Sequence, residues 1–138
     1  MKILFFSTFA LILSIFTNPM KAQELHHKNN YVVLTNKIPQ LQPIFLTAQA
    51  LAEEDGKSFG DFQAIICGAT VKDLTDIKAM EPFIETAEKA HVKVVVCGLS
   101  LKKFQVDPKD IPTEIEVVAN GLLYNFQLQK KGYLSIEL

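Results

Sequence analysis

The chain has 138 residues, a length that favours one domain, and its composition of 49% hydrophobic and 21% charged residues is ordinary for a globular protein. All 14 basic residues are lysines, so the guanidinium groups that make two-pronged contacts with phosphates and base edges are missing. With a formal net charge of −1 and no basic run, the chain is not expected to bind nucleic acid.

Residues 1–22 have the organisation of a cleavable signal peptide. Lys2 supplies a positive start, residues 3–16 form an apolar run, and Ala22 offers a small residue for cleavage. The run is short for a membrane span, which needs about 20 residues. We therefore expect a periplasmic or secreted protein with no membrane attachment after cleavage, and the alternative is an uncleaved anchor.

Residues 23–30 are polar and without periodicity, which predicts a flexible lead-in to a single α/β domain over residues 31–138. His26 and His27 lie in this stretch. Adjacent histidines can bind a metal weakly, but no cysteine or carboxylate stands at a ligand spacing from them, so a linker is the expected role.

From residue 31 onward, short apolar runs alternate with segments of helical spacing. Strands are expected at residues 31–34, 62–66, 92–96, 115–118 and 133–138. Helices are expected to begin at Pro43 and Pro82, the second with Glu81 and Glu85 near its N-terminus, and a last helix ends at Gly132. Because parallel strands need helical crossovers, this order predicts a three-layer α/β/α sandwich with a mostly parallel five-stranded sheet and the last strand at an edge.

Cys97 is the strongest candidate for chemistry. It follows the apolar run at residues 92–96 and precedes a helix-like segment, which places it at the carboxyl end of a buried strand. Ligands and reactive groups collect at that edge of an open parallel sheet. Backbone N–H groups of a following helix would stabilise the thiolate, and Gly98 permits a sharp turn.

Three further residues are expected to support Cys97. Ser100 could donate a hydrogen bond to the sulfur, and Lys102 with Lys103 adds positive potential. His91 precedes the strand and should lie at the opposite edge, so a cysteine activated by a histidine base is disfavoured. A thiolate that itself carries a group fits better.

Cys67 repeats the surroundings of Cys97. Both cysteines begin the pattern C-G-x-[ST]-x-K, thirty residues apart, so both thiols are expected at the carboxyl edge. Three alternatives stay open: a structural disulfide, two unlinked buried thiols, or a functional Cys97. Asn36 and Asn120 follow other strands and are further candidates at this edge, although Asn120 with Gly121 is also a common strand-to-helix turn.

Several familiar motifs are missing from the sequence. It has no G-x-G-x-x-G, no P-loop, no H-E-x-x-H and no C-x-x-C. We therefore expect neither a nucleotide cofactor nor a metal, and no thioredoxin-type exchange.

The second half of the chain resembles the DsrE/DsrF-like family, among its small stand-alone proteins. The resemblance rests on the segments VVVCGLSL, VDPKDI and IEVVANGLLYNFQLQKKGY, the last with Gln129 and Gly132 before the final strand. The first half is compatible, so that the resemblance covers about 108 residues from Tyr31.

This resemblance implies a compact α/β/α fold, a homotrimer or hexamer, and a sulfur-relay role. In the relay subunits a cysteine after the third strand carries sulfur as a persulfide, a role that falls on Cys97. Those subunits work in the cytoplasm, whereas this chain has an export signal, and Cys67 has no expected family counterpart.

The expected function is therefore that of an exported sulfur carrier, rather than a turnover enzyme, acting with a donor or acceptor protein. The alternatives are a non-catalytic oligomeric module that binds a small ligand, or a thiol–disulfide switch between Cys67 and Cys97.

Overall fold

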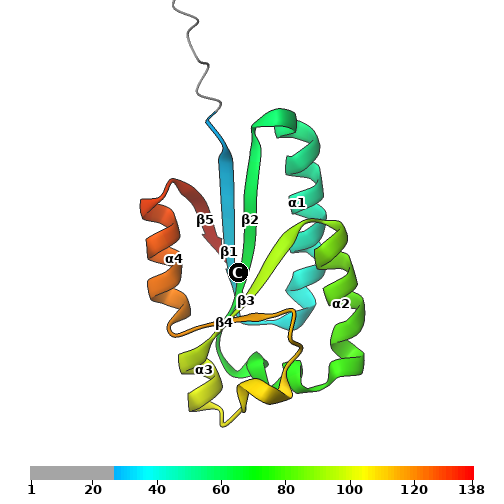
Figure 1. The fold of residues 1–138 in the computed structure, drawn as a ribbon, viewed down its shortest axis with the longest axis vertical. Helices are drawn as coiled ribbons and strands as arrows, with labels where there is room; N and C mark the ends of the chain where they lie inside the picture. Colours follow the sequence, from blue (N-terminus) through cyan, green and yellow to red (C-terminus); the bar gives the residue numbers. More distant parts are fainter. Residues whose placement is uncertain (1–26) are drawn as a thin grey trace, which may run out of the picture.

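The computed structural model describes residues 27–138, so the expected signal peptide and His26 lie outside the described part. Five strands form one sheet in the order β4-β3-β2-β1-β5, and every neighbouring pair is parallel (Figure 1). The expected α/β class and the edge position of the last strand are confirmed. The strands are β1 (Asn29–Thr35), β2 (Phe59–Ile66), β3 (Val92–Cys97), β4 (Glu116–Val118) and β5 (Tyr133–Glu137).

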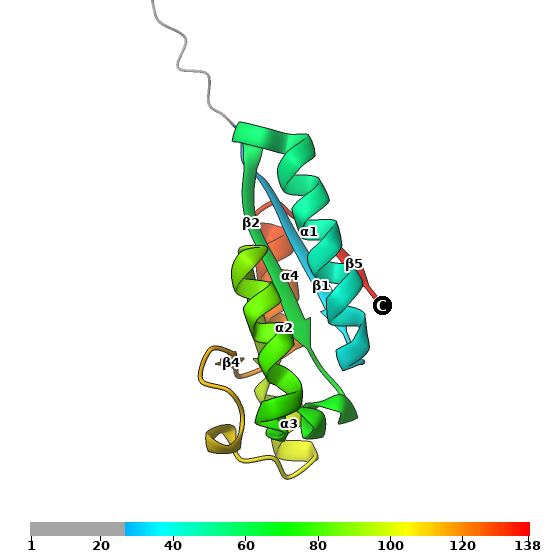
Figure 2. The ribbon, with the colours of Figure 1, turned by 90° about the vertical axis from the view of Figure 1, so that its right-hand side faces the viewer.

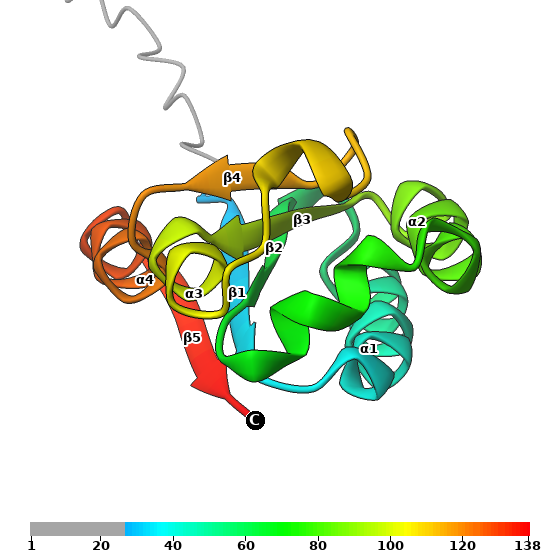
Figure 3. The same cartoon turned by 90° about the horizontal axis from the view of Figure 1, so that it is seen from below.

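The helices cover both faces of the sheet and complete the three layers. Helices α1 (Leu41–Asp55) and α2 (Ile77–Lys89) lie side by side on one face, as Figure 2 shows. Helix α4 (Gly121–Lys130) covers the other face, and the short α3 (Gly98–Lys103) lies at the carboxyl edge, onto which Figure 3 looks. From β1 to β4, each new strand is added on the same side of the strand before it, whereas β5 is added on the other side of β1. Because the crossovers are right-handed, this reversal places α4 on the face opposite α1 and α2.

The two sides of the sheet differ in their packing. The larger core lies against α1 and α2 and includes the fully buried Phe45, Phe62 and Met80. Under α4 the apolar cluster is much smaller. It consists of Val32, Leu34, Ile65, Val95 and Leu128.

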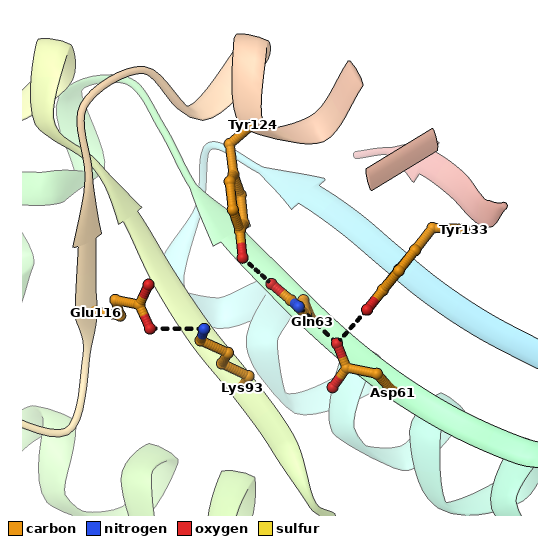
Figure 4. A network of polar contacts seen from close by, with 6 residues as sticks. All are labelled: Asp61, Gln63, Lys93, Glu116, Tyr124 and Tyr133. Carbon is orange, nitrogen blue, oxygen red and sulfur yellow. Dashed lines mark hydrogen bonds and ion pairs between the residues drawn. The ribbon is translucent and has the colours of Figure 1, made fainter. Parts of the chain in front are cut away.

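Polar side chains occupy part of the sheet face beneath α4 (Figure 4). The Tyr124 hydroxyl donates to Gln63 Oε1 at 2.9 Å, and the Tyr133 hydroxyl donates to Asp61 Oδ2 at 2.6 Å. Gln63 Nε2 also donates to Asp61 at 2.5 Å, which links the two tyrosines through one chain of hydrogen bonds. Gln63 is only 5% exposed, so this network supplies the partners that its buried amide needs.

Several element boundaries differ from those expected. β1 and β2 start earlier, at Asn29 and Phe59, and β3 includes Cys97. The expected start of a helix at Pro82 is wrong, because α2 begins at Ile77 and the Asp76 carboxylate caps it by accepting from the N–H of Ala79 at 3.1 Å. Pro82 is the sixth residue of α2, and Glu81 and Glu85 lie within the helix instead of near its N-terminus.

Residues 27–138 include no helix long and apolar enough to cross a membrane.

Candidate functional site: a two-cysteine cleft

Cys67 and Cys97 meet at the carboxyl edge of the sheet. β2 and β3 are neighbours, and their last paired residues are Ile66 and Val96, so the two cysteines stand at the next position of the same register. Side chains alternate along a strand, and both cysteines therefore point to the face that α4 covers. Both are free thiols.

The environment of Cys97 favours its thiolate. The side chain is 4% exposed, and its sulfur accepts a hydrogen bond from the backbone N–H of Gly121 at 3.2 Å. Burial raises the pKa of Cys97, but the Gly121 N–H, the hydroxyl and N–H of Ser100, and the neighbouring Cys67 together lower it below its ordinary value. Gly121 is the first residue of α4, so the sulfur also lies near the positive end of that helix.

Cys67 has the opposite tendency. Burial raises the pKa of this thiol from 9.0 to about 12, and the charge and hydrogen bonding of Cys97 and the charge of Glu137 act in the same direction. Of the two thiols, Cys97 is therefore the one that loses its proton more readily. The thiolate is the reactive form of cysteine, so the two neighbouring thiols differ in the ease with which that form is reached.

Gly121 is required by close packing between the two cysteines. A Cβ atom at this position would lie 2.7 Å from Cys67 Sγ and 3.0 Å from Cys97 Cβ. Gly98 is similarly confined, since a Cβ there would lie 2.9 Å from the carbonyl oxygen of Val118. The absence of side chains at Gly98 and Gly121 lets α3, β4 and α4 close around the thiols.

Ser100 and Asn120 have structural contacts at the same edge. Ser100 Oγ accepts from the backbone N–H of Gly68 at 2.9 Å, which joins the ends of the two cysteine-bearing strands. Asn120 Oδ1 accepts from the N–H groups of Leu122 and Leu123 and so caps α4. The turn role anticipated for Asn120 is thus present, and it fixes the helix whose first N–H reaches Cys97.

A cleft of about 340 Å³ opens beside the two thiols. Five of the predicted site residues line it, namely Asn36, Cys67, Cys97, Ser100 and Asn120. Gly98 and Lys102 do not line the cleft, and Lys103 is the lysine that does. The other lining residues are Leu34, Gly68, Leu99, Leu122 and Glu137.

Two contributors to the site were not singled out from the sequence. In the sequence, Gly121 is noticeable only as part of a turn. Its N–H becomes a hydrogen-bond donor to the Cys97 sulfur because the strand order brings the start of α4 to the end of β3. Glu137 is one of the polar residues that alternate with apolar ones in the last strand. This alternation is the sequence signal that could have identified it as a residue of the cleft. His91 directly precedes β3, at the edge of the sheet opposite the cysteines, as expected.

Among residues 27–138, no group of three or more histidine, cysteine, aspartate or glutamate side chains is arranged to hold a metal ion.

Comparison with solved structures shows the same fold in two proteins of unknown function. One, from Methanobacterium thermoautotrophicum, has 15% sequence identity and a TM-score of 0.68, and the match covers 80% of this chain and all of that one. The other, from Bacteroides thetaiotaomicron, has 17% identity and a TM-score of 0.60, and the match covers 80% of this chain and 95% of that one. No curated protein matches the sequence.

The sequence itself matches the model of the DsrE/DsrF-like family over residues 47–136. This range includes both cysteines, Ser100 and the start of α4, and it spans well over half of the chain. The protein therefore belongs to the DsrE/DsrF-like family.

Proposed function

We propose that the protein is a sulfur carrier that holds sulfane sulfur on Cys97 as a persulfide. The observation that carries this proposal is the sulfur of Cys97, which accepts the Gly121 N–H at 3.2 Å and has a lowered pKa at the edge of a cleft. Thiolate is the form of cysteine that attacks sulfur. Family membership supports a sulfur-relay role in general terms.

Loading is a displacement at sulfur. The Cys97 thiolate attacks the outer sulfur of an inorganic polysulfide and forms a new S–S bond, while the donor's own S–S bond breaks. The shortened polysulfide leaves with the electron pair. Delivery follows when the thiolate of an acceptor protein attacks the outer sulfur of the persulfide and returns Cys97 to its thiolate.

The small cleft and the 4% exposure of Cys97 favour a small inorganic donor over a bulky one. Lys103 at the cleft provides a positive charge for an anionic donor. A protein acceptor would have to present its own thiol at this edge, where α3 and the start of α4 form the rim.

Two features of the whole protein belong to the same proposal. Export, inferred from residues 1–22, would place the carrier in the periplasm or outside the cell. Assembly into a homotrimer or hexamer would bury the outward side of α4, where Leu122, Leu123 and Phe126 are each more than half exposed. Large apolar side chains gathered on an exposed surface are typical of a site of protein–protein contact.

The test is mass spectrometry of the intact protein after exposure to inorganic polysulfide and rapid desalting. We expect the wild type and Cys67→Ser to gain one sulfur atom at first contact, and Cys97→Ser to gain none. Equal labelling of Cys97→Ser and the wild type would overturn the proposal. A Cys97→Ser variant that keeps the protein's biological effect would instead support the ligand-binding alternative.

A further inference from the structure

The second thiol lies in position to react with whatever Cys97 carries. Cys67 and Cys97 occupy neighbouring parallel strands at one register position and point to one face. Neighbouring strands are about 4.8 Å apart, within the range of Cα separations that a disulfide spans. Gly121, which packs against both residues, contributes no side chain between them.

We propose that Cys67 is a resolving thiol, which converts the Cys97 persulfide into a Cys67–Cys97 disulfide and releases hydrosulfide. The inference rests on the proposed function, since it takes the persulfide on Cys97 as its substrate. It identifies the chemical fate of the sulfur when no acceptor is present: reduction to hydrosulfide by the protein's own second thiol.

The step balances without an outside oxidant. The Cys67 sulfur attacks Sγ of the Cys97 persulfide, the Sγ–Sγ bond forms, and the bond from Cys97 Sγ to the outer sulfur breaks. The outer sulfur leaves with that electron pair, takes up the Cys67 proton, and departs as hydrosulfide. The sulfane sulfur is reduced, and the two cysteine sulfurs are oxidised to the disulfide.

Burial of Cys97 Sγ makes the internal attack on this atom favourable over attack on the same atom by an outside thiol. Cys97 is 4% exposed, whereas Cys67 is already its neighbour and lies at the same cleft. A reaction between two groups held in place avoids the entropy cost of bringing them together.

Loading itself prepares Cys67 for the attack. Two of the causes that raise the pKa of Cys67 are the charge of the Cys97 sulfur and its hydrogen bonding. Once Cys97 Sγ is bonded to a second sulfur, that charge no longer resides on it. In the persulfide anion the charge lies on the outer sulfur, which can take up the Cys67 proton as Cys67 attacks Sγ.

The reaction also has a defined reverse and a defined reset. Hydrosulfide that attacks Cys97 Sγ in the disulfide regenerates the persulfide and the Cys67 thiol by the same path. A dithiol reductant returns both cysteines to thiols. The persulfide and the disulfide are thus two forms of one oxidation level, and the hydrosulfide concentration sets their ratio.

The experiment follows reduced, desalted protein after a short exposure to inorganic polysulfide. Intact mass and released hydrosulfide, trapped with a bimane reagent, are measured together over time. We expect the wild type to lose its added sulfur and two hydrogen atoms as an equivalent amount of hydrosulfide appears. Cys67→Ser should keep the added sulfur, because it cannot form the disulfide. Cys67→Ala should behave in the same way, and a circular dichroism spectrum equal to that of the wild type shows that the result is not due to misfolding.

The outcomes separate the two proposals. If the wild type keeps its added sulfur as long as Cys67→Ser, and no peptide linking the two cysteines is found, the resolving role is overturned while the carrier role stands. If neither protein gains sulfur, the carrier role fails and this inference fails with it. A gain of sulfur by Cys97→Ser would assign loading to Cys67 and overturn both.

Discussion

The backbone N–H of Gly121 donates to the sulfur of Cys97 at 3.2 Å, although 24 positions separate the two residues in the chain. This contact joins the end of β3 to the first turn of α4. It combines the two effects that lower a thiol's pKa at a helix start, a direct N–H donor and the positive end of the helix dipole.

Replacement of Gly121 by alanine should disturb both thiols. The new Cβ would lie 2.7 Å from Cys67 Sγ, so Cys67 or the start of α4 must move, at a cost of about 1–3 kcal/mol in the free energy of unfolding. We expect lower stability in urea and slower alkylation of Cys97 at neutral pH. Gly132→Ala is the control, because its φ of +90° strains the backbone with nothing within 4 Å. If both variants slow alkylation equally, close packing at Gly121 is not the cause.

Ser100→Ala should raise the pKa of Cys97. The hydroxyl of Ser100 favours the thiolate, and its oxygen also accepts the N–H of Gly68. Loss of that acceptor leaves a partly buried donor unpaired, which costs about 1–3 kcal/mol. The pH profile of iodoacetamide alkylation in Cys67→Ser background should shift to higher pH. Ser135→Ala is the control. It removes a hydroxyl of β5 that donates to Asn125 of α4, away from Cys97, and should leave the profile in place.

Lys103 and Lys102 should differ in their effect on loading. Lys103 lines the cleft and Lys102 does not. Lys103→Gln should slow loading by anionic polysulfide about two- to fivefold at low salt, which corresponds to roughly 0.4–1 kcal/mol for an exposed charge. The difference should shrink as salt is added. The matched Lys102→Gln variant should load at the wild-type rate, and an equal slowing in both would assign the effect to net charge alone.

Tyr133→Phe should reduce the loss of stability at alkaline pH. Burial and the hydrogen bond to Asp61 raise the pKa of Tyr133 from 10.0 to about 12. Because the pKa of Tyr133 is higher in the folded than in the unfolded protein, the protonated hydroxyl contributes to the free energy of unfolding. This contribution is complete below pH 10.0 and is lost as the pH rises toward about 12. Thermal midpoints measured across this window should fall less steeply in the variant. The remaining slope belongs partly to Tyr31 and Cys67, whose pKa values are also raised to about 12, so Tyr31→Phe with Tyr133→Phe should flatten it further.

A charge on the outward side of α4 should dissociate the proposed oligomer. Phe126 is 61% exposed, and a glutamate at this position would be buried against a second copy of the chain without a partner. Light scattering should give a mass of several chains for the wild type and a lower mass for Phe126→Glu. The neighbouring Gln127→Glu adds the same charge at another exposed position and serves as control. A wild type that stays monomeric at high concentration contradicts the oligomer.

The sequence predicted the alternation of strands and helices because each central strand contains a short, mainly apolar run, most clearly Val94, Val95 and Val96. It predicted the carboxyl-edge position of both cysteines for the same reason. Pro82 misled the prediction of a helix start. The helix begins earlier, at the Asp76 cap, and the packing of Met80 and Ala87 in the core stabilises it past the hydrogen bond that the proline removes.

The order of the strands could not be derived from local pattern, and the site depends on it. Only the adjacency of β2 and β3 brings Cys67 to Cys97, and only the return of the chain from β4 to β5 brings Gly121 to both. The choice of Lys103 over Lys102 likewise depends on how α3 is turned against the sheet, which six residues of sequence do not determine.

The crossing of α4 from β4 to β5 has a consequence for the chain during its synthesis. Cys97 is made before Gly121, so the nascent chain contains the sulfur while its backbone donor does not yet exist. An ordinary, largely protonated thiol reacts slowly with sulfur donors and with oxidants. The lowered pKa of Cys97 therefore belongs to the folded protein alone, because the Gly121 N–H reaches the sulfur only after α4 has docked against the sheet.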